Sequence, residues 1–193
     1  VRIDVANTRV IPISKDRHLL LSERFDRTPE GKRRHFASAM SLLGLDDGSG
    51  AGTGNGYLDI VDFIVRNCTD VQQSLHELYR RVAFNVLFGN TDDHFRNHGF
   101  ILTLKGWTLS PAYDINPSTK NHQWLPIHEI TELSDINALR DSCESYMLDR
   151  GDASDIINEV ICVIRDWQRV AIENQIPVRV LEQYDNRWTH HTS

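Results

Sequence analysis

The sequence predicts an α+β protein that is mainly helical and carries two short pairs of strands. Apolar residues recur at helical spacing in several segments, most clearly between Val71 and Phe88. Two other segments, at the N-terminus and after Gly99, are rich in β-branched and aromatic residues and are bounded by turn residues. A chain of 193 residues suffices for one compact domain or for one lobe of a larger protein.

The composition narrows the class of protein. Hydrophobic residues make up 40% of the chain and charged residues 25%, as in ordinary soluble globular proteins. The 27 acidic and 21 basic residues give a formal charge of -6, which argues against a protein that coats nucleic acid through bulk charge. No apolar run has membrane-spanning length, and Val1 lies inside an expected strand, so we expect further sequence upstream. Three widely separated cysteines without a Cys-x-x-Cys motif indicate a reducing, cytoplasmic compartment.

The N-terminal segment is expected to form an antiparallel strand pair. Val1–Ser14 has strand-like stretches around a polar break at Asn7, and Lys15-Asp16 is typical of a turn. His18–Leu21 is the expected second strand and runs into Ser22–Arg27, before the sequence Thr-Pro-Glu-Gly ends it.

A helix with a glycine stop is expected next, from the spacing of Phe36, Ala39, Met40 and Leu43 before Gly44. Asp46–Gly56 has glycine at every second position from 48 to 56. It matches neither the Gly-x-Gly-x-x-Gly nor the P-loop pattern, so we interpret it as a flexible surface loop rather than a phosphate-binding loop. A further helix is indicated by Leu58, Val61, Ile64 and Val65.

The clearest helix is Val71–Phe88, which Gly89-Asn90 should end. A later helix, capped by Ser134 and stopped by Gly151, would carry Ile136, Leu139, Cys143 and Met147. A last long helix, capped by Asp152 or Ser154, would carry the apolar stripe from Ile157 to Ala171. The polar residues 185–193 are expected to be a frayed tail.

A hairpin is expected between Gly99 and Leu109, with Lys105-Gly106 as its two-residue turn. That turn places Leu104 opposite Trp107 and, in the same register, Asn97 opposite Asp114. Directly opposed residues have Cβ atoms about 5 Å apart. The hairpin would therefore bring the polar cluster Asp92, Asp93, His94, Asn97 and His98 beside Asp114.

This cluster suits magnesium-dependent phosphoryl transfer. Asp92 precedes Asn97 by five residues, and Asp114 follows across the hairpin. One carboxylate can orient a hydroxyl, while an amide oxygen and a second carboxylate offer the oxygen ligands that Mg²⁺ takes. Protein kinases use this order and spacing of a catalytic Asp, an Asn, a hairpin and a metal-binding Asp.

Four stretches together carry a resemblance to a known family: Ser22–Arg27 (SERFDR); Val82–Leu87 running into Gly89–His94 (VAFNVL, GNTDDH); Arg96–Gly99 (RNHG); and Leu109–Asp114 (LSPAYD). In sequence, order and spacing they resemble the C-terminal part of the HipA-family serine/threonine kinases, the toxins of bacterial toxin–antitoxin pairs. The resemblance covers most of the chain to about Pro117 and extends, in helical layout only, to Gln175.

The resemblance implies a protein-kinase-like C-lobe with a short N-terminal strand pair at the hinge and a β-hairpin at the active site. Residues 1–193 would form one HipA-like C-terminal kinase domain, with 1–27 a remnant of the N-lobe and hinge, 28–184 the helical C-lobe and 185–193 a tail. The implied cofactors are ATP and Mg²⁺. The implied catalytic residue is Asp92, and the implied Mg²⁺ ligands are Asn97 and Asp114. The nucleotide site would be lined by His94 to Asn97 and by Tyr113 to Asn116. Glu23, Arg24 and Phe25 would form the hinge, where the carbonyl of Glu23 and the N–H of Phe25 pair with adenine.

The resemblance also implies partners and departures. A protein substrate and a HipB-like antitoxin are expected, with DNA contacted only through that complex and no membrane contact. Such kinases carry their glycine-rich loop and phosphate-binding lysine upstream of the position of Val1, so residues 1–193 alone are expected to be inactive. Thr91 stands where many kinases have Arg, and Asp114-Ile115-Asn116 lacks the usual Phe-Gly.

Two other classes remain open at this point. One is a metal-dependent phosphohydrolase of another fold, which would use Asp92, Asp93, His94 and Asp114. The other is a kinase-like binding module that docks an antitoxin without catalysis. We expect Asp93 to be solvated. His94 and His98 have a zinc-binding spacing only on a helix, and this segment is predicted to be a loop.

Overall fold

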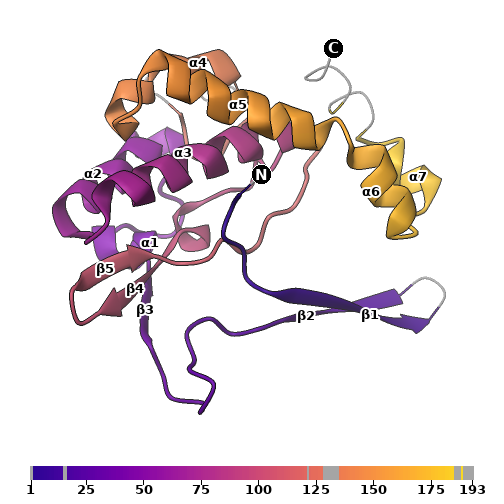
Figure 1. Cartoon of the computed structure of the whole chain (residues 1–193), viewed down its shortest axis with the longest axis horizontal. Helices are drawn as coiled ribbons and strands as arrows, with labels where there is room; N and C mark the ends of the chain where they lie inside the picture. Colours follow the sequence, from indigo (N-terminus) through magenta and orange to yellow (C-terminus); the bar gives the residue numbers. More distant parts are fainter. Residues whose placement is uncertain (1, 15–16, 121, 128–134, 185–187, 189–193) are drawn as a thin grey trace.

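The computed structural model describes the chain except residues 1, 15–16, 121, 128–134, 185–187 and 189–193. Helices are stacked above a small sheet, and a two-stranded ribbon projects away from them (Figure 1). The strands are β1 (Thr8–Ser14), β2 (Arg17–Ser22), β3 (His35–Ser38), β4 (Gly99–Thr103) and β5 (Gly106–Leu109). The helices are α1 (Ala39–Leu43), α2 (Tyr57–Asn67), α3 (Val71–Phe88), α4 (Ile136–Asp141), α5 (Arg150–Ile164), α6 (Trp167–Glu173) and α7 (Val178–Leu181), with 3-10 turns η1 (Ala51–Thr53), η2 (Phe95–Asn97) and η3 (Cys143–Tyr146).

The expected N-terminal strand pair is confirmed. Strands β1 and β2 are antiparallel, with Val10 opposite Leu20. The ribbon joins the helical body through the segment before β1, where the N–H of Ala6 donates to the carbonyl of Ala112 at 2.9 Å and the N–H of Ala112 donates to the carbonyl of Asp4 at 2.7 Å. This exchange anchors the chain two residues before Asp114.

The hairpin exists, but the predicted register is wrong. Leu102 lies opposite Trp107 and Thr103 opposite Gly106, so the turn residues are Leu104 and Lys105. The Thr103 hydroxyl explains the shift, because it accepts from the N–H of Lys105 at 3.2 Å and donates to the carbonyl of Gly106 at 2.8 Å. Gly106 opens the returning strand with a φ of 134°, a value that disfavours any residue with a side chain.

Phe36 lies in a strand and not in the expected helix. It pairs with Ile101, and β3 makes the third strand of a sheet ordered β3-β4-β5. The helix begins only at Ala39, where the Ser38 side chain caps it, and it ends at Gly44 with a φ of 66°, as predicted. The apolar residues that were expected to form one helix are therefore divided between two elements, with Phe36 in β3 and the others in α1. Pairing of Phe36 with a strand distant in sequence outweighed the local helical periodicity.

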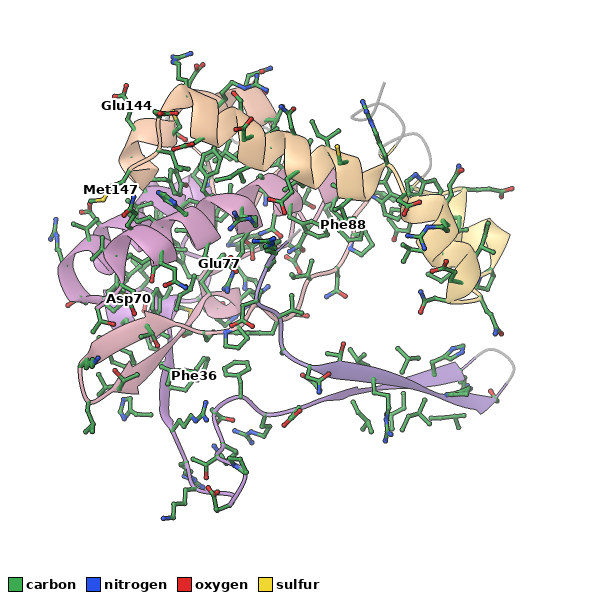
Figure 2. The ribbon with its side chains drawn as sticks, in the orientation of Figure 1. Phe36, Asp70, Glu77, Phe88, Glu144 and Met147 are labelled. Atoms are coloured by element: carbon green, nitrogen blue, oxygen red, sulfur yellow. The ribbon has the colours of Figure 1, made fainter. Side chains whose placement is uncertain are left out.

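Helix α3 has the predicted bounds and forms the centre of the core. Its apolar stripe is buried between α2 and α5, and Gly89 ends it with a φ of 87°. Asp70 and Phe88, labelled in Figure 2, mark its two ends. The predicted α2 is also present. A rigid, buried helix thus leads directly into the residues that follow Gly89.

The C-terminal helices differ from the prediction in their boundaries. Asp135 caps α4, and Ser134 lies outside the described residues. Gly151 lies inside α5 and stops nothing; Asp149 caps α5 by accepting from the N–H of Asp152 at 2.8 Å, so neither Asp152 nor Ser154 is the cap. The last stripe is divided between α5 and α6, which are separated at Arg165-Asp166.

Two segments expected to be loose are packed in part. A Cβ on Gly50 would lie 2.8 Å from the carbonyl oxygen of Trp124, and one on Gly56 would lie 2.5 Å from that of Pro126, so the glycine-rich segment is held against residues 124–126. In the tail, Trp188 is buried and its indole N–H donates to the carbonyl of Phe88 at 2.7 Å. The expectation of a frayed tail is therefore wrong for Trp188, while 185–187 and 189–193 lie outside the described residues.

Candidate functional site

The residues after α3, 90–98, form the site loop. Asp92 is exposed, whereas the preceding Thr91 and the following Asp93 are buried. Burial alternates along this stretch, so the Asp92 side chain faces solvent while those of Thr91 and Asp93 face the interior. The backbone is fixed here too, because the N–H of Trp124 donates to the carbonyl of Thr91 at 2.9 Å.

The prediction that Asp93 is solvated is wrong. Its side chain is 3% exposed, and its Oδ2 accepts three hydrogen bonds. The donors are the Tyr57 hydroxyl at 2.6 Å, Nδ2 of Asn85 at 2.8 Å and Nε2 of His98 at 2.7 Å. A buried carboxylate is costly unless such donors compensate it, and these three come from α2, from α3 and from the site loop itself.

Asn97 closes the other side of Asp92. Its side chain is buried at the end of η2, and its Nδ2 donates to the backbone carbonyl of Asp92 at 3.4 Å. The N–H of Asn97 donates to the carbonyl of His94 at 2.8 Å, which forms the tight turn between them. Because Nδ2 is engaged with Asp92, the side-chain oxygen of Asn97 is the atom left for a cation or a substrate group.

The Asp114 segment, residues 112–116, is tied to the site loop at two points. The Tyr113 hydroxyl donates to the carbonyl of Arg96 at 2.6 Å, and the N–H of Asn116 donates to Oδ1 of Asn90 at 3.4 Å. Asp114 is exposed, adopts a φ of 57°, and accepts from Nδ2 of Asn116 at 2.9 Å. The two segments are thus neighbours, while the convergence of Asn97 and Asp114 on one metal ion stays a prediction.

Arg81, on the buried face of α3, holds the chain that leads into the Asp114 segment. Its guanidinium donates to the carbonyl of Ser110 at 2.9 Å and to Glu77 at 2.9 Å. Burial lowers the pKa of Arg81, and the nearby carboxylate of Glu77 opposes that shift. An arginine remains charged under such a shift, so it fixes the chain four residues before Asp114 by a charge-assisted bond.

The expected hinge meets the Asp114 segment through aromatic rings. The ring of Phe25 lies 5.5 Å from those of both Phe36 and Tyr113. Phe36, labelled in Figure 2, lies on β3, the strand that pairs with β4 of the hairpin. The side chains of the other two hinge residues make their hydrogen bonds locally, Glu23 with Asn7 at 3.0 Å and Arg24 with Asp26 at 2.6 and 2.8 Å. Among the described residues, Phe25 is the one of the three whose side chain contacts the rest of the predicted site.

His94 is half-buried in the site loop, with its ring perpendicular to that of Trp124 at 6.5 Å. Its Nδ1 is buried and has no hydrogen-bond partner among the described residues. His98 does not join it as a ligand pair, because its Nε2 is bonded to Asp93. Within the described chain, no group of three or more His, Cys, Asp or Glu side chains is arranged to hold a metal ion.

Burial determines the protonation of the phenols around the site. It is the largest cause that raises the pKa of Tyr57 well above the ordinary value, and the Asp93 carboxylate adds to it. Burial likewise raises the pKa of Tyr113, with further contributions from Asp93 and Asp114. Both hydroxyls therefore keep their protons at neutral pH and act as donors, Tyr57 to Asp93 and Tyr113 to Arg96.

Sequence reasoning did not find the residues that surround Asp93. Tyr57 also accepts from Nε2 of Gln123 at 3.1 Å, and the same nitrogen donates to the carbonyl of Asn90 at 3.0 Å. One signal was available, because Asn85 lies on the apolar face of α3 and a polar residue there needs a buried partner. For Tyr57 and Gln123 the sequence offered none.

A profile of the HipA-like C-terminal domain matches residues 1–167. The chain belongs to this family. The HipA-like domain is 27% identical over 130 residues to the serine/threonine-protein kinase toxin HipA of Shewanella oneidensis, a match that covers 58% of this chain and 30% of that protein. It is 31% identical over 97 residues to a putative kinase of Haemophilus influenzae, covering 47% of this chain and 28% of that one.

Among solved structures, the HipA-like domain matches a chain in the complex of Shewanella oneidensis MR-1 HipA, HipB and operator DNA. The TM-score is 0.77 at 17% identity, over 98% of this chain and 50% of that chain. The resemblance to the family is thus confirmed and the fold is shared. The sequence matches cover less than a third of the length of the two curated relatives, and the structural match covers half of the solved chain. Of the described helices of the HipA-like domain, none combines the length and the apolar character needed to cross a bilayer.

Proposed function

We propose that the HipA-like domain is the catalytic lobe of a serine/threonine kinase that transfers the γ-phosphoryl group of Mg²⁺-ATP to a protein hydroxyl. The observation that carries the proposal is the pairing of an exposed Asp92 with a buried Asn97 that holds the backbone of Asp92. Family membership and the kinase names of the relatives support it. The shared fold supports a kinase-like C-lobe as its architecture.

In this proposal Asp92 is the catalytic residue. Its carboxylate accepts no hydrogen bond from any residue that the structure describes, so it is available to a substrate hydroxyl. As the hydroxyl oxygen forms a bond to the γ-phosphorus, the bond from phosphorus to the β–γ bridging oxygen breaks, ADP leaves, and the hydroxyl proton passes to Asp92. Such a transfer needs positioning and charge neutralisation more than covalent chemistry from the protein.

Asn97 and Asp114 would hold Mg²⁺, and their donor atoms fit that ion. Mg²⁺ takes oxygen ligands and usually one or two carboxylates together with phosphate oxygens. Asn97 bonds Asp92 through Nδ2, which leaves its side-chain oxygen available. Asp114 accepts from Asn116 through Oδ1, which leaves Oδ2 available. Mg²⁺ bound there would neutralise the phosphate charge that grows during transfer.

The nucleotide base would lie at the Phe25 side of the site. Phe25 and Tyr113 form a tilted aromatic pair that lines the boundary between the hinge and the Asp114 segment. The carbonyl of Glu23 and the N–H of Phe25 would pair with the adenine edge, and His94 to Asn97 with Tyr113 to Asn116 would line the rest. Arg24 would contribute only its backbone, because its side chain forms an exposed ion pair with Asp26.

A HipB-like antitoxin is the proposed protein partner, apart from the phosphorylated substrate. The solved chain that shares this fold comes from a complex with HipB and operator DNA, which supports the proposal. DNA would be contacted only within such a complex, since the net charge of -6 offers no general attraction to nucleic acid. A kinase that uses ATP and an intracellular antitoxin would act in the cytoplasm.

The buried hydrogen-bonding of Asp93 argues against the phosphohydrolase alternative. That enzyme class would use Asp93 as a metal ligand, but its Oδ2 is committed to three protein donors. The binding-module alternative and the kinase proposal make different predictions only about the transfer of phosphate. The test below therefore distinguishes them by measuring that transfer.

The test uses a chimera in which the part of Shewanella HipA that precedes the matched region is joined to this chain. Asp92→Asn should retain nucleotide and Mg²⁺ binding and abolish transfer. Asp114→Asn should weaken Mg²⁺-dependent ATP binding, because a ligand charge is lost. Asp155→Asn, an exposed carboxylate on α5, is the matched control and should change neither.

The measurements are ATP affinity with and without Mg²⁺, and phosphate transfer to a generic Ser/Thr protein substrate and to the chimera itself. A folded chimera that binds ATP but transfers no phosphate would leave the binding module as the function. Transfer that survives Asp92→Asn would show that the catalytic assignment is wrong.

A further inference from the structure

We infer that Asp93 is a positioning residue: its buried carboxylate fixes the direction of the Asp92 side chain and, through a chain of asparagine side chains, the placement of Asp114. The inference rests on the proposed function for its catalytic consequence. Its structural consequence, the coupling of the site loop to the Asp114 segment, is independent of that function and can be measured separately.

The anchoring of Asp93 is unusually complete for a loop residue. Three donors from three elements converge on one oxygen, and two of them, Tyr57 and Asn85, lie on helices of the core. The third, His98, is 2% exposed and is the residue just before β4. Since the carboxylate can only accept, Nε2 of His98 must carry a hydrogen. Asp93 is thus tied to α2, to α3 and to the start of the hairpin.

This anchoring bears directly on Asp92, which is the next residue. The segment from Asn90 to His94 is itself neither helix nor strand, so its side-chain directions depend on what each side chain binds. Asp93 is held inward by its three donors, and its neighbour Asp92 is the exposed one of the two aspartates. Asn97 then holds the carbonyl of Asp92 from the other side. If the peptide group between Asp92 and Asp93 rotated, the Asp92 carboxylate would change its position and direction.

A continuous chain of hydrogen bonds leads from Asp93 to Asp114. Asn85 donates to Asp93 and accepts from Nδ2 of Asn90 at 3.1 Å. Asn90 in turn accepts from the N–H of Asn116, and Nδ2 of Asn116 donates to Asp114. In the side chains of Asn85 and Asn90 the amide nitrogen donates and the amide oxygen accepts, whereas Asn116 donates from its backbone N–H to Asn90 and from Nδ2 to Asp114. We call this set, Asp93–Asn85–Asn90–Asn116–Asp114, the asparagine chain.

The asparagine chain explains why polar residues occupy buried places on α3 and just after its end. Asn85 is 3% exposed and Asn90 is 1% exposed, where apolar residues would pack without a desolvation cost. Each has its hydrogen-bonding atoms satisfied by another member, so the group acts as one network that specifies a single arrangement of both loops. The arrangement it specifies places the two aspartates on which the proposed reaction depends.

The test compares Asp93→Asn and Asp93→Ala with Ile157→Val in the chimera described above. Asparagine has the same shape and retains an acceptor oxygen, but its bonds lose the assistance of charge. Ile157→Val, in a fully buried position on α5, lowers stability without touching the network. At a temperature where all three are folded by circular dichroism, we expect kcat to fall by about 10- to 100-fold for Asp93→Asn and further for Asp93→Ala. KM for Mg²⁺-ATP should rise in both because Asp114 loses its placement, whereas Ile157→Val should change neither constant.

A second readout needs no activity and covers the case in which Asp93→Ala does not fold. Amide hydrogen exchange in Asp93→Asn should accelerate in residues 91–94 and also in 114–116, whereas Ile157→Val should leave both segments unchanged relative to wild type. Asn90→Ala should accelerate 114–116 and weaken Mg²⁺-dependent ATP binding.

The outcomes separate the two proposals. Unchanged kcat in a folded Asp93→Asn, or unchanged exchange in 114–116, would overturn the positioning role even if the kinase function holds. If the wild-type chimera transfers no phosphate but exchange in 114–116 still responds to Asp93→Asn, the asparagine chain stands and the kinase proposal fails.

Discussion

The hydroxyl of Tyr113 donates a 2.6 Å hydrogen bond to the backbone carbonyl of Arg96. This contact joins residues 17 apart in sequence and brings the residue before Asp114 to the residue before Asn97. The ring of Tyr113 at the same time lies against Phe25. One side chain of the Asp114 segment therefore contacts both of the other segments in which the proposed nucleotide and metal residues occur.

Tyr113→Phe should separate these two contributions, because it removes the hydrogen bond and keeps the ring. We expect a loss of about 0.5–1.5 kcal/mol in the free energy of unfolding, measured by urea denaturation. Tyr113→Ala should cost more, since it also removes the contact with Phe25. Equal losses for the two variants would mean that the hydroxyl contributes nothing.

The same bond has a predicted pH dependence. Because burial raises the pKa of Tyr113 in the folded protein, its contribution to stability is fully present below the pKa of an unfolded tyrosine. It is lost progressively as the pH rises from that value through the higher folded one. Across pH 7 to 9, the stability difference between wild type and Tyr113→Phe should stay constant within about 0.3 kcal/mol, as followed by urea titrations at each pH.

Gly99→Ala should destabilise the three-stranded sheet. An added Cβ would lie 2.3 Å from Cε2 of Phe36 and 2.9 Å from Oγ of Ser110, so the Phe36 ring on β3 and the Ser110 side chain just after β5 would both have to move. We expect a cost of about 1–3 kcal/mol by urea denaturation. Gly52→Ala is the matched control, because an added Cβ there meets nothing within 4 Å. A neutral Gly99→Ala would show that the close approach of Phe36 is relieved by local movement.

Trp188→Ala should loosen the end of α3. The Trp188 ring is stacked on Phe88 at 5.1 Å and on Tyr184 at 5.1 Å, and it lies 4.8 Å from Trp167. Loss of a buried Trp typically costs about 3–5 kcal/mol. Trp188→Phe should recover part of that loss by restoring a stacked ring without the N–H bond to Phe88. If removal of Trp188 costs less than about 1 kcal/mol, the tail does not stabilise the core.

The three cysteines should react at different rates with iodoacetamide at pH 8. Cys162 is exposed on α5 and should be modified first. Cys68 should react slowly, because burial and then the carboxylate of Asp70 raise its pKa to about 11 and the thiolate is the reactive species. Peptide mass spectrometry of the folded chain measures the order. In urea the difference should vanish, which distinguishes the effect of folding from that of local sequence.

Much of the helical structure was predictable because it depends on neighbours in sequence. The stripe of Val71–Phe88 and the stop at Gly89 are local features, and the structure has them where the periodicity indicates. The hairpin was predictable as an element, but its register depended on the Thr103 hydroxyl bonding across the turn, which the preference for glycine turns did not reveal. Phe36 shows the converse, since its strand exists only because β4 lies beside it.

The candidate site divides in the same way. The order of Asp92, Asn97 and Asp114, and the family to which the chain belongs, were legible in the sequence because they are patterns of residue type and spacing. What only the tertiary structure decided is the difference between two adjacent aspartates. Asp92 and Asp93 have the same chemistry and nearly the same local context, yet one is exposed and the other is buried.

That difference arises because the partner with the shortest hydrogen bond to Asp93 is distant along the chain. Tyr57 is 36 residues away, and it reaches Asp93 only when α2 packs beside α3. A carboxylate is stable out of water where several donors converge on it, and the convergence of donors from separate helices is a property of packing rather than of any local pattern. The sequence determined which groups are available at the site, and the packing of α2 against α3 decided which of the two aspartates faces the solvent.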